Sequence, residues 1–204
     1  MRRTFVLSVA AALMATIVLV VTGVVLASVY RNSVERAFDA RLSVYLRMLV
    51  VNLVSADKRL KVLPQSIGET LFELPLSGWY WQINALGVSK PEIRSSRSLW
   101  DTGLTRLRDE DAATSPDGVR HGYAIGPAEQ RLRLIERTVD LGDDGRYLIA
   151  VAGDALEIDD QMRFFQEAVA VSFGFLATLL ALLMYFHTRL VRVGFARQAP
   201  SGAA

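Results

Sequence analysis

The stretch Leu74–Ile83, LPLSGWYWQI, contains the densest aromatic group of the chain. Pro75 and Gly78 favour a turn at its start. The side chains that follow alternate between two faces, with Trp79, Trp81 and Ile83 on one and Tyr80 and Gln82 on the other. This alternation predicts a strand with an aromatic face in a core, where burying each large side chain contributes about 1.5–3 kcal/mol. Two interpretations stay open: a plain core strand, or a strand whose Tyr80 and Gln82 line a ligand cleft.

Two uncharged runs lie far from this strand, Thr4–Val29 of 26 residues and Ala168–Phe186 of 19 residues. A helix of about 20 apolar residues spans the hydrocarbon layer of a membrane and satisfies its own backbone hydrogen bonds there. We therefore expect transmembrane helices over residues 4–30 and 168–186, with membrane lipid as a partner. The alternative for the first run is a cleavable signal peptide, but the apolar part of such a peptide is only about 7–15 residues long.

Basic residues outside the two runs predict the orientation. Arg2 and Arg3 precede the first run, and Arg189, Arg192 and Arg197 follow the second. Positive flanks stay in the cytoplasm, so residues 1–3 and 187–204 are expected there and residues 31–167 on the periplasmic side of a bacterial inner membrane. The loop has 21 acidic and 18 basic residues, a net charge of −3. The basic excess of the whole chain is thus a topology signal, and we expect no nucleic-acid partner.

Residues 31–63 predict a long amphipathic helix, because they contain no Gly or Pro and Pro64 follows. Apolar side chains recur at spacings of three and four: Val34, Phe38, Leu42, Tyr45, Leu49 and Leu53. This stripe has three possible partners: the sheet of its own domain, a second copy of the chain, or each in a different stretch. For a homodimer, the expected interface consists of Phe38, Leu42, Tyr45 and Leu49.

A sheet is expected within residues 72–152. Gln130–Asp140 and Arg146–Ala152 alternate as strands, and LGDDG at Leu141–Gly145 predicts a hairpin turn between them. Glu92–Trp100 predicts a further strand or extended edge. Its Arg94 and Arg97 could bind a carboxylate or phosphate ligand, or form ion pairs with nearby acidic residues. Together these segments predict a central antiparallel sheet.

The segment Leu104–Gly126 is polar and rich in Asp, Gly, Pro and Ser, which predicts a long surface loop. Its acidic residues lack the spacing of a calcium loop, the chain has no cysteine, and His121 has no second ligand nearby in sequence. We expect no metal site and no catalytic residue.

Residues 154–167 predict an exit helix that Asp154 can cap and that no Gly or Pro separates from the second apolar run. The fold class is therefore α+β, with two transmembrane helices flanking a mixed α/β domain. Movement of the sheet relative to these helices could reach the cytoplasm as a piston, tilt or rotation.

Several motifs resemble the input module of proteobacterial membrane sensor histidine kinases over about residues 1–194: Phe72–Ile83 (FELPLSGWYWQI), Ser96–Asp101 (SRSLWD), Leu132–Arg137 (LRLIER) and Val151–Asp154 (VAGD). The resemblance implies a PAS-like (PDC-type) periplasmic sensor domain, a homodimer, and coupling through the second span to a HAMP linker and a kinase core of a two-component phosphorelay. ATP, Mg²⁺ and a response regulator would be partners of that core.

The sequence departs from this family after Phe186. HTRLVRVGF at His187–Phe195 is similar to the start of a HAMP linker, but no phospho-acceptor histidine motif or ATP-binding motif follows. The chain is expected to be a fragment, a truncated gene product, or a stand-alone subunit that pairs with a full-length kinase. The chain carries no kinase catalytic core, and whether it is an enzyme is left open.

The expected function is a membrane-bound signal-sensing module that detects a periplasmic stimulus and transmits it to a phosphorelay. The alternative is a non-signalling, membrane-anchored periplasmic binding or assembly protein. The residues expected to bind a ligand are Tyr80, Gln82, Arg94 and Arg97.

Overall fold

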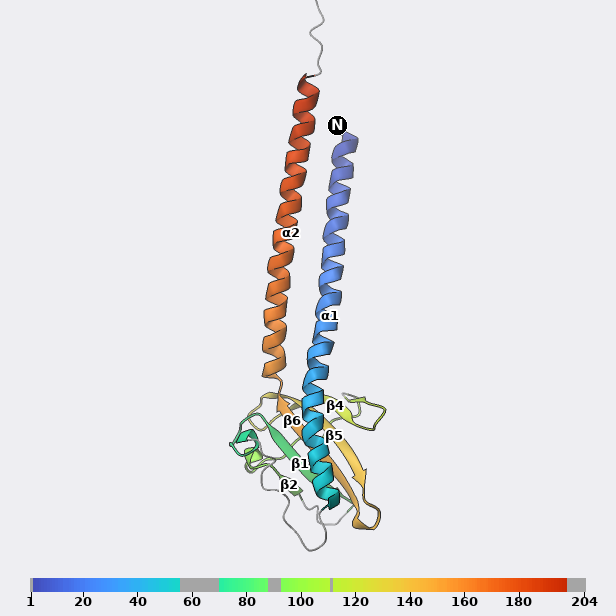
Figure 1. The fold of residues 1–204 in the computed structure, drawn as a ribbon, viewed down its shortest axis with the longest axis vertical. Helices are drawn as coiled ribbons and strands as arrows, with labels where there is room; N and C mark the ends of the chain where they lie inside the picture. Colours follow the sequence, from blue (N-terminus) through green and yellow to red (C-terminus); the bar gives the residue numbers. More distant parts are fainter. Residues whose placement is uncertain (1, 56–69, 88–92, 111, 198–204) are drawn as a thin grey trace, which may run out of the picture. The chain divides into compact units, whose positions relative to one another are not determined.

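A computed structural model describes residues 2–55, 70–87, 93–110 and 112–197 of the chain (Figure 1). Two long helices stand at the ends of the described chain, α1 (Arg2–Ser55) and α2 (Leu156–Arg197). Between them lie six strands: β1 (Tyr80–Leu86), β2 (Ile93–Ser95), β3 (Ala113–Thr114), β4 (Arg120–Ile125), β5 (Arg131–Asp140) and β6 (Arg146–Asp154). Three short 3₁₀ helices complete the set: η1 (Thr70–Phe72), η2 (Arg97–Leu99) and η3 (Gly142–Asp144). The α+β class is confirmed.

The strands form one antiparallel sheet in the order β2-β1-β6-β5-β4-β3. The predicted hairpin is confirmed, since β5 and β6 pair from Leu132 with Asp154 to Asp140 with Arg146. η3 closes the turn, and Gly145 there has φ +96°, a value that favours glycine. Strand β1, which contains the aromatic residues Tyr80 and Trp81, pairs with the edge of β6 opposite β5, from Tyr80 with Ala152 to Leu86 with Arg146.

The prediction of a long surface loop over Leu104–Gly126 is wrong in its second half. Arg120–Ile125 forms β4, which pairs along its length with β5, and Ala113–Thr114 forms the short edge strand β3. The polar composition concealed the alternation of His121, Tyr123 and Ile125. Pairing with a neighbouring strand and burial of one face decide whether such a segment is a strand, and composition does not reveal either.

The chain divides into two compact units, and each helix contributes to both. One unit comprises Met1–Asn32 with Gln161–Ala204, and the other comprises Ser33–Asp160. We call the second unit, which contains all six strands, the sheet unit. Two helical stretches are long and apolar enough to cross a membrane, Leu13–Val54 in α1 and Leu156–Phe186 in α2. Within the first unit the rings of Tyr30 and Phe165 stack with centroids 4.0 Å apart.

The exit helix and the second apolar run form one continuous helix, because α2 extends from Leu156 to Arg197 without interruption. Its start is capped as expected, since the Leu156 N–H donates to Asp154 Oδ1 at 2.9 Å. Helix α1 continues to Ser55. The remainder of the helix expected to residue 63 lies outside the described residues.

The sheet has two covered faces. The face that α1 crosses in Figure 1, here called the helix face, includes Trp81, Ile83, Ile135, Ile149 and Val151. The opposite face is here called the loop face. On it Tyr80, Leu132, Leu134 and Ala152 form a buried cluster with Leu99 and Leu107 from the segment between β2 and β3. Both faces are core.

Helix α1 contacts the sheet where Phe38 meets Gly153. A Cβ added at Gly153 would lie 2.7 Å from Phe38 Cζ and 3.3 Å from Trp79 Cη2. The rings of Phe38 and Trp79 are 5.5 Å apart, and those of Tyr45 and Phe72 are 5.2 Å apart. Glycine at this position therefore permits aromatic side chains of the helix to reach the sheet.

Candidate functional site

Tyr80 and Gln82, the two residues expected to line a cleft, lie on the buried loop face with exposed fractions of 0% and 5%. The Tyr80 hydroxyl accepts from the Gly78 N–H at 3.2 Å and from Gln130 Nε2 at 2.6 Å. Gln82 Oε1 accepts from the Leu104 N–H at 2.7 Å, while its Nε2 donates to Asn84 Oδ1 at 2.7 Å. These polar atoms thus bond within the chain and hold the segment between β2 and β3 against the sheet.

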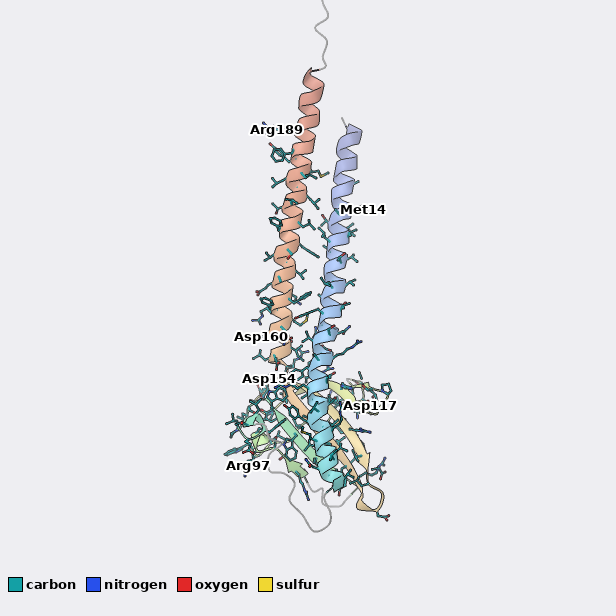
Figure 2. The ribbon with its side chains drawn as sticks, in the orientation of Figure 1. Met14, Arg97, Asp117, Asp154, Asp160 and Arg189 are labelled. Carbon is teal, nitrogen blue, oxygen red and sulfur yellow. The ribbon has the colours of Figure 1, made fainter. Side chains whose placement is uncertain are left out.

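The two expected arginines are not brought to the same place as these residues. Arg94 in β2 is the register partner of Ile83, so it belongs to the helix face. Arg97 in η2 lies at the periphery of the sheet unit (Figure 2), 3.9 Å from Glu73, with its side chain 65% exposed. The structure therefore assembles no common site from Tyr80, Gln82, Arg94 and Arg97, and their role in ligand binding stays a prediction.

The expected dimer stripe packs on its own sheet. Phe38, Leu42, Tyr45 and Leu49 are buried, with exposed fractions of 6%, 0%, 8% and 1%. The placement of a homodimer interface on these four residues is therefore corrected: the sheet of the same chain already covers them. Of the three partners left open by the periodicity, the structure selects the chain's own domain.

The helix face contains a group of five partly or fully buried polar and charged residues that we call the helix–sheet ionic cluster. Its members come from three elements: Glu35 and Asp39 from α1, His121 and Tyr123 from β4, and Arg133 from β5. Arg133 binds Asp39 through two parallel contacts, Nε to Oδ1 at 2.8 Å and Nη2 to Oδ2 at 2.7 Å. Such a bidentate pair is the strongest geometry available to arginine and a carboxylate.

The other members extend this pair in both directions. Glu35 Oε2 lies 3.8 Å from Arg133 Nη1, and Glu35 Oε1 accepts from the Tyr123 hydroxyl at 2.8 Å. His121 Nδ1 lies 3.2 Å from Asp39 Oδ2, although without hydrogen-bond geometry. On its other side, His121 Nε2 is 2.7 Å from Ser115 Oγ. The cluster therefore joins the helix to two strands about 90 residues away in sequence.

Burial and neighbouring charges shift the pKa values of Arg133 and Tyr123. Burial lowers the pKa of Arg133, but the hydrogen bonds and attraction from Asp39 outweigh this, so its pKa is raised above the ordinary value. Burial, together with the hydrogen bond to the Glu35 carboxylate, raises the pKa of the Tyr123 phenol. With His121 neutral, two carboxylates face one guanidinium, and the five side chains carry a net charge of −1.

This arrangement attaches α1 to the sheet, and the strength of the attachment depends on the charges of the cluster. Among the described residues no group of three or more His, Cys, Asp or Glu could hold a metal ion.

Sequence reasoning did not find this cluster. A signal was present in Gln130–Asp140, where Arg131 and Arg133 share a face with Ile135, an unusual pattern for a face that enters a core. The matching signal in the helix is Glu35 and Asp39, spaced four apart beside the apolar stripe. Neither pattern identifies its partner, because the pairing depends on which part of the helix crosses β5.

A second ionic cluster, here called the strand ionic cluster, lies on the loop face of the same two strands. Arg120 and Glu136 are register partners on β4 and β5, with Nη1 and Oε1 3.0 Å apart. Arg120 Nη2 also contacts Asp109 Oδ1 at 2.8 Å and donates to the Leu107 carbonyl at 3.0 Å. The Glu136 side chain is 1% exposed, so Arg120 provides the charge that its burial requires.

A third feature is an exposed apolar patch next to Arg97, formed by Leu74, Leu76 and Trp100. These side chains are 51%, 52% and 75% exposed, and the Leu76 N–H donates to the Ser98 carbonyl at 2.9 Å. Leu76 and Trp100 have φ values of 55° and 54°, a left-handed conformation that is uncommon for large side chains. Exposed large side chains held in strained backbone are typical of interaction surfaces.

No protein-family model matches the chain, and neither does any curated protein or solved structure.

Proposed function

We propose that the chain is a membrane-bound signal-sensing module in the bacterial inner membrane. In this proposal the sheet unit lies in the periplasm, both termini lie in the cytoplasm, and the module passes a periplasmic stimulus to a histidine kinase core of a two-component phosphorelay. That core, with its ATP and Mg²⁺, belongs to a partner or to a longer chain. The resemblance of Phe72–Ile83 and Ser96–Asp101 to the input module of such kinases supports the assignment to this class.

The observation that carries the proposal is the continuity of the two helices. The sheet unit begins within α1 and ends within α2, and each of these helices continues without interruption into a stretch able to cross a membrane. An anchor needs only one such helix. A domain inserted between two of them can transmit a change in their relative position, provided that a stimulus favours one arrangement over another.

The helix–sheet ionic cluster is the proposed point where a stimulus acts on α1. Its carboxylates belong to the helix, whereas its cation and hydrogen-bond donors belong to the sheet. Any event that alters its charge therefore changes the free energy of holding α1 on β4 and β5. His121 belongs to the same contact, since it faces Asp39 from α1 and Ser115 from the β3–β4 turn.

The test is a fusion of residues 1–194 to the HAMP linker and kinase core of a characterised sensor kinase, with autophosphorylation measured in membranes. Periplasmic pH, cations and small anions are varied. The expected result is a condition-dependent output that His121→Gln or Asp39→Asn alters, while Arg146→Met, in an exposed ion pair with Asp140, leaves it unchanged. A fusion that is active under every condition without change would contradict the sensing role.

The second candidate function, an anchored binding or assembly protein, is favoured by the patch of Leu74, Leu76 and Trp100. Such a protein would need its binding surface and a membrane helix as anchor. It would not need a contact between helix and sheet that responds to a stimulus. Under this function, Trp100→Ala would remove capture of a periplasmic protein partner from detergent extracts, and the fusion would show no stimulus response. The two functions thus predict opposite outcomes for the stimulus response of the fusion.

A further inference from the structure

The start of α2 is attached to β5 through a single residue, Arg131. The Ala155 N–H donates to the Arg131 carbonyl at 2.9 Å, and Ala155 is fully buried. The Arg131 side chain adds an ion pair, because its Nη1 donates to both carboxylate oxygens of Asp159, at 3.1 and 3.2 Å. Figure 2 labels Asp154 and Asp160, the residues at the two ends of this stretch. Arg131 therefore binds the start of α2 with its backbone and with its side chain.

The same arginine stacks on the ring of Tyr123 from β4. The guanidinium carbon of Arg131 lies 4.0 Å from the ring centroid, and that of Arg133 lies 4.8 Å from it. Tyr123 and Arg133 are register partners, so the ring stands on the paired region of the sheet. An exposed ion pair is weakened by the entropy cost of ordering a long side chain, and stacking on a fixed ring reduces that cost. The Tyr123 ring thus positions the guanidinium that binds Asp159.

Tyr123 is also bound from the other helix. Its hydroxyl donates to Glu35 Oε1 of α1 at 2.8 Å. A continuous series of contacts, which we call the helix-to-helix relay, therefore joins the two helices through the sheet. Its members are Glu35 on α1, Tyr123 on β4, Arg131 on β5 and Asp159 on α2. All four residues belong to the sheet unit.

A second contact joins the same two helices directly. Arg41 Nη1 of α1 lies 3.5 Å from Glu157 Oε2 of α2, and these side chains are 43% and 48% exposed. The side chains of the Arg131 pair are 45% and 42% exposed, so exposure alone would give the two ion pairs similar strength. The pairs differ in the ring that each arginine contacts. Arg131 lies on Tyr123, a member of the helix–sheet ionic cluster, whereas Arg41 lies 4.4 Å from the ring of Trp79.

We propose that Tyr123 and Arg131 are positioning residues that couple the attachment of α1 to the attachment of α2. When Glu35 releases the Tyr123 hydroxyl, the ring is no longer fixed from α1, and Arg131 loses the surface that positions it on Asp159. The start of α2 then opens more often. The signalling role of this coupling rests on the proposed function, in which a change at the ionic cluster must reach the second helix.

Hydrogen exchange of the full chain in detergent micelles tests the coupling. The readout is the exchange rate of the backbone amides in residues 159–165 of α2, and the amides of β6 are the reference for general opening. Glu35→Ala removes the acceptor of the Tyr123 hydroxyl. It should raise the exchange rate at 159–165 by about threefold or more relative to β6, the lower range for residues coupled in one network. Tyr123→Phe, which keeps the ring but loses the hydroxyl, should give a similar increase.

A double-mutant cycle separates the relay from the direct contact. In the Arg131→Met background the start of α2 already exchanges faster, and Glu35→Ala should add little to that rate. The matched control is Arg41→Met, which breaks the direct contact with Glu157 instead. In that background Glu35→Ala should keep its full effect, because the relay is intact.

Three results would overturn the proposal: no acceleration at 159–165, equal acceleration in β6, or an effect of Glu35→Ala that is undiminished in the Arg131→Met background. Tyr123→Phe keeps the test valid if Glu35→Ala does not fold. Hydrogen exchange makes no use of kinase output, so an unresponsive fusion would remove the sensing proposal and leave the coupling intact. A responsive fusion with additive exchange effects would remove the coupling and leave the sensing proposal.

Discussion

The two ionic clusters occupy opposite faces of the same pair of strands, β4 and β5, yet they hold different things together. In the strand ionic cluster, Arg120 and Glu136 are register partners in adjacent strands. In the helix–sheet ionic cluster, Arg133 binds Asp39 from a helix 94 residues away. The first pair is held in place by the hydrogen bonds of the sheet itself. The second attaches a separate element, so its loss would remove an attachment of α1 to the sheet.

The difference shows which face of the sheet provides a charge-dependent attachment for α1. On the loop face, the polar atoms of Gln82 and Glu136 bind the backbone of Leu104 and Leu107, so charge there fixes a loop to the sheet. On the helix face, two carboxylates share one guanidinium, and His121 lies beside one of these carboxylates. We expect substitutions in the two ionic clusters, and glycine substitutions on the two faces, to distinguish the attachment of α1 from the attachment of the loop.

The largest expected effect is that of Arg133→Met. It leaves Glu35 and Asp39 without their cation in a site where the side chains are 19% and 14% exposed. Breaking a buried pair in this way typically destabilises a protein by about 3–5 kcal/mol. The measurement is urea unfolding in detergent micelles followed by tryptophan fluorescence, since Trp79, Trp81 and Trp100 all lie in the sheet unit.

The control for this prediction is Arg146→Met, which removes an ion pair that is 66% and 58% exposed. Exposed pairs contribute about 0–1 kcal/mol, so this variant should unfold close to the parent. Equal losses in both variants would mean that the cluster is not a strong attachment of the helix.

A smaller effect is expected for Arg120→Met, which leaves the single carboxylate of Glu136 without its arginine. Glu136 keeps the Leu107 N–H at 3.4 Å, and the adjacent strands stay paired, so we expect a loss at the lower end of the range for a broken buried pair, about 3 kcal/mol. In the kinase fusion, this variant should shift stability without changing the stimulus response. A response altered as much as by Asp39→Asn would remove the distinction between the two clusters.

Two glycine substitutions compare the packing of the two faces. Gly153→Ala places a methyl group 2.7 Å from Phe38 on the helix face, and overpacking of this kind typically destabilises by about 1–3 kcal/mol. Gly103→Ala on the loop face meets its nearest atom, Gln82 Oε1, at 3.5 Å, an ordinary contact. It should be neutral or slightly stabilising. Thermal unfolding by tryptophan fluorescence checks both, and a destabilising Gly103→Ala would contradict the described loop face.

The smallest effect is expected for Tyr123→Phe, which removes the hydrogen bond to Glu35 and about 1 kcal/mol of stability near neutral pH. The pKa of Tyr123 is raised in the folded protein, so folding binds its proton more tightly. Its contribution is therefore complete below the ordinary tyrosine value of about 10 and is lost as pH rises through the folded-state value. Alkaline unfolding profiles should show this loss in the parent and a smaller one in the variant.

Several parts of the fold were predictable because they depend on neighbours in sequence. The β5–β6 hairpin follows from two alternating segments and a glycine-containing turn, and the cap of α2 follows from Asp154 at its start. β4 was missed because its polar residues are stabilised by partners on β5 and α1. For the same reason Tyr80 and Gln82 appeared available for a ligand: alternation assigned them to the second face, but it did not show that residues 99–107 cover that face.

The sequence by itself determined the two long apolar runs, the antiparallel hairpin, the aromatic strand and the buried stripe of α1. Each of these depends on local spacing, because a helix or strand sorts its side chains by a fixed period. Only the tertiary structure decided what the stripe packs against, which face α1 crosses, and that Arg133 meets Asp39 and Glu35. Those pairings join residues far apart in the chain, and their geometry depends on how closely a helix can approach a strand, as at Gly153, where an added Cβ would lie 2.7 Å from Phe38 Cζ.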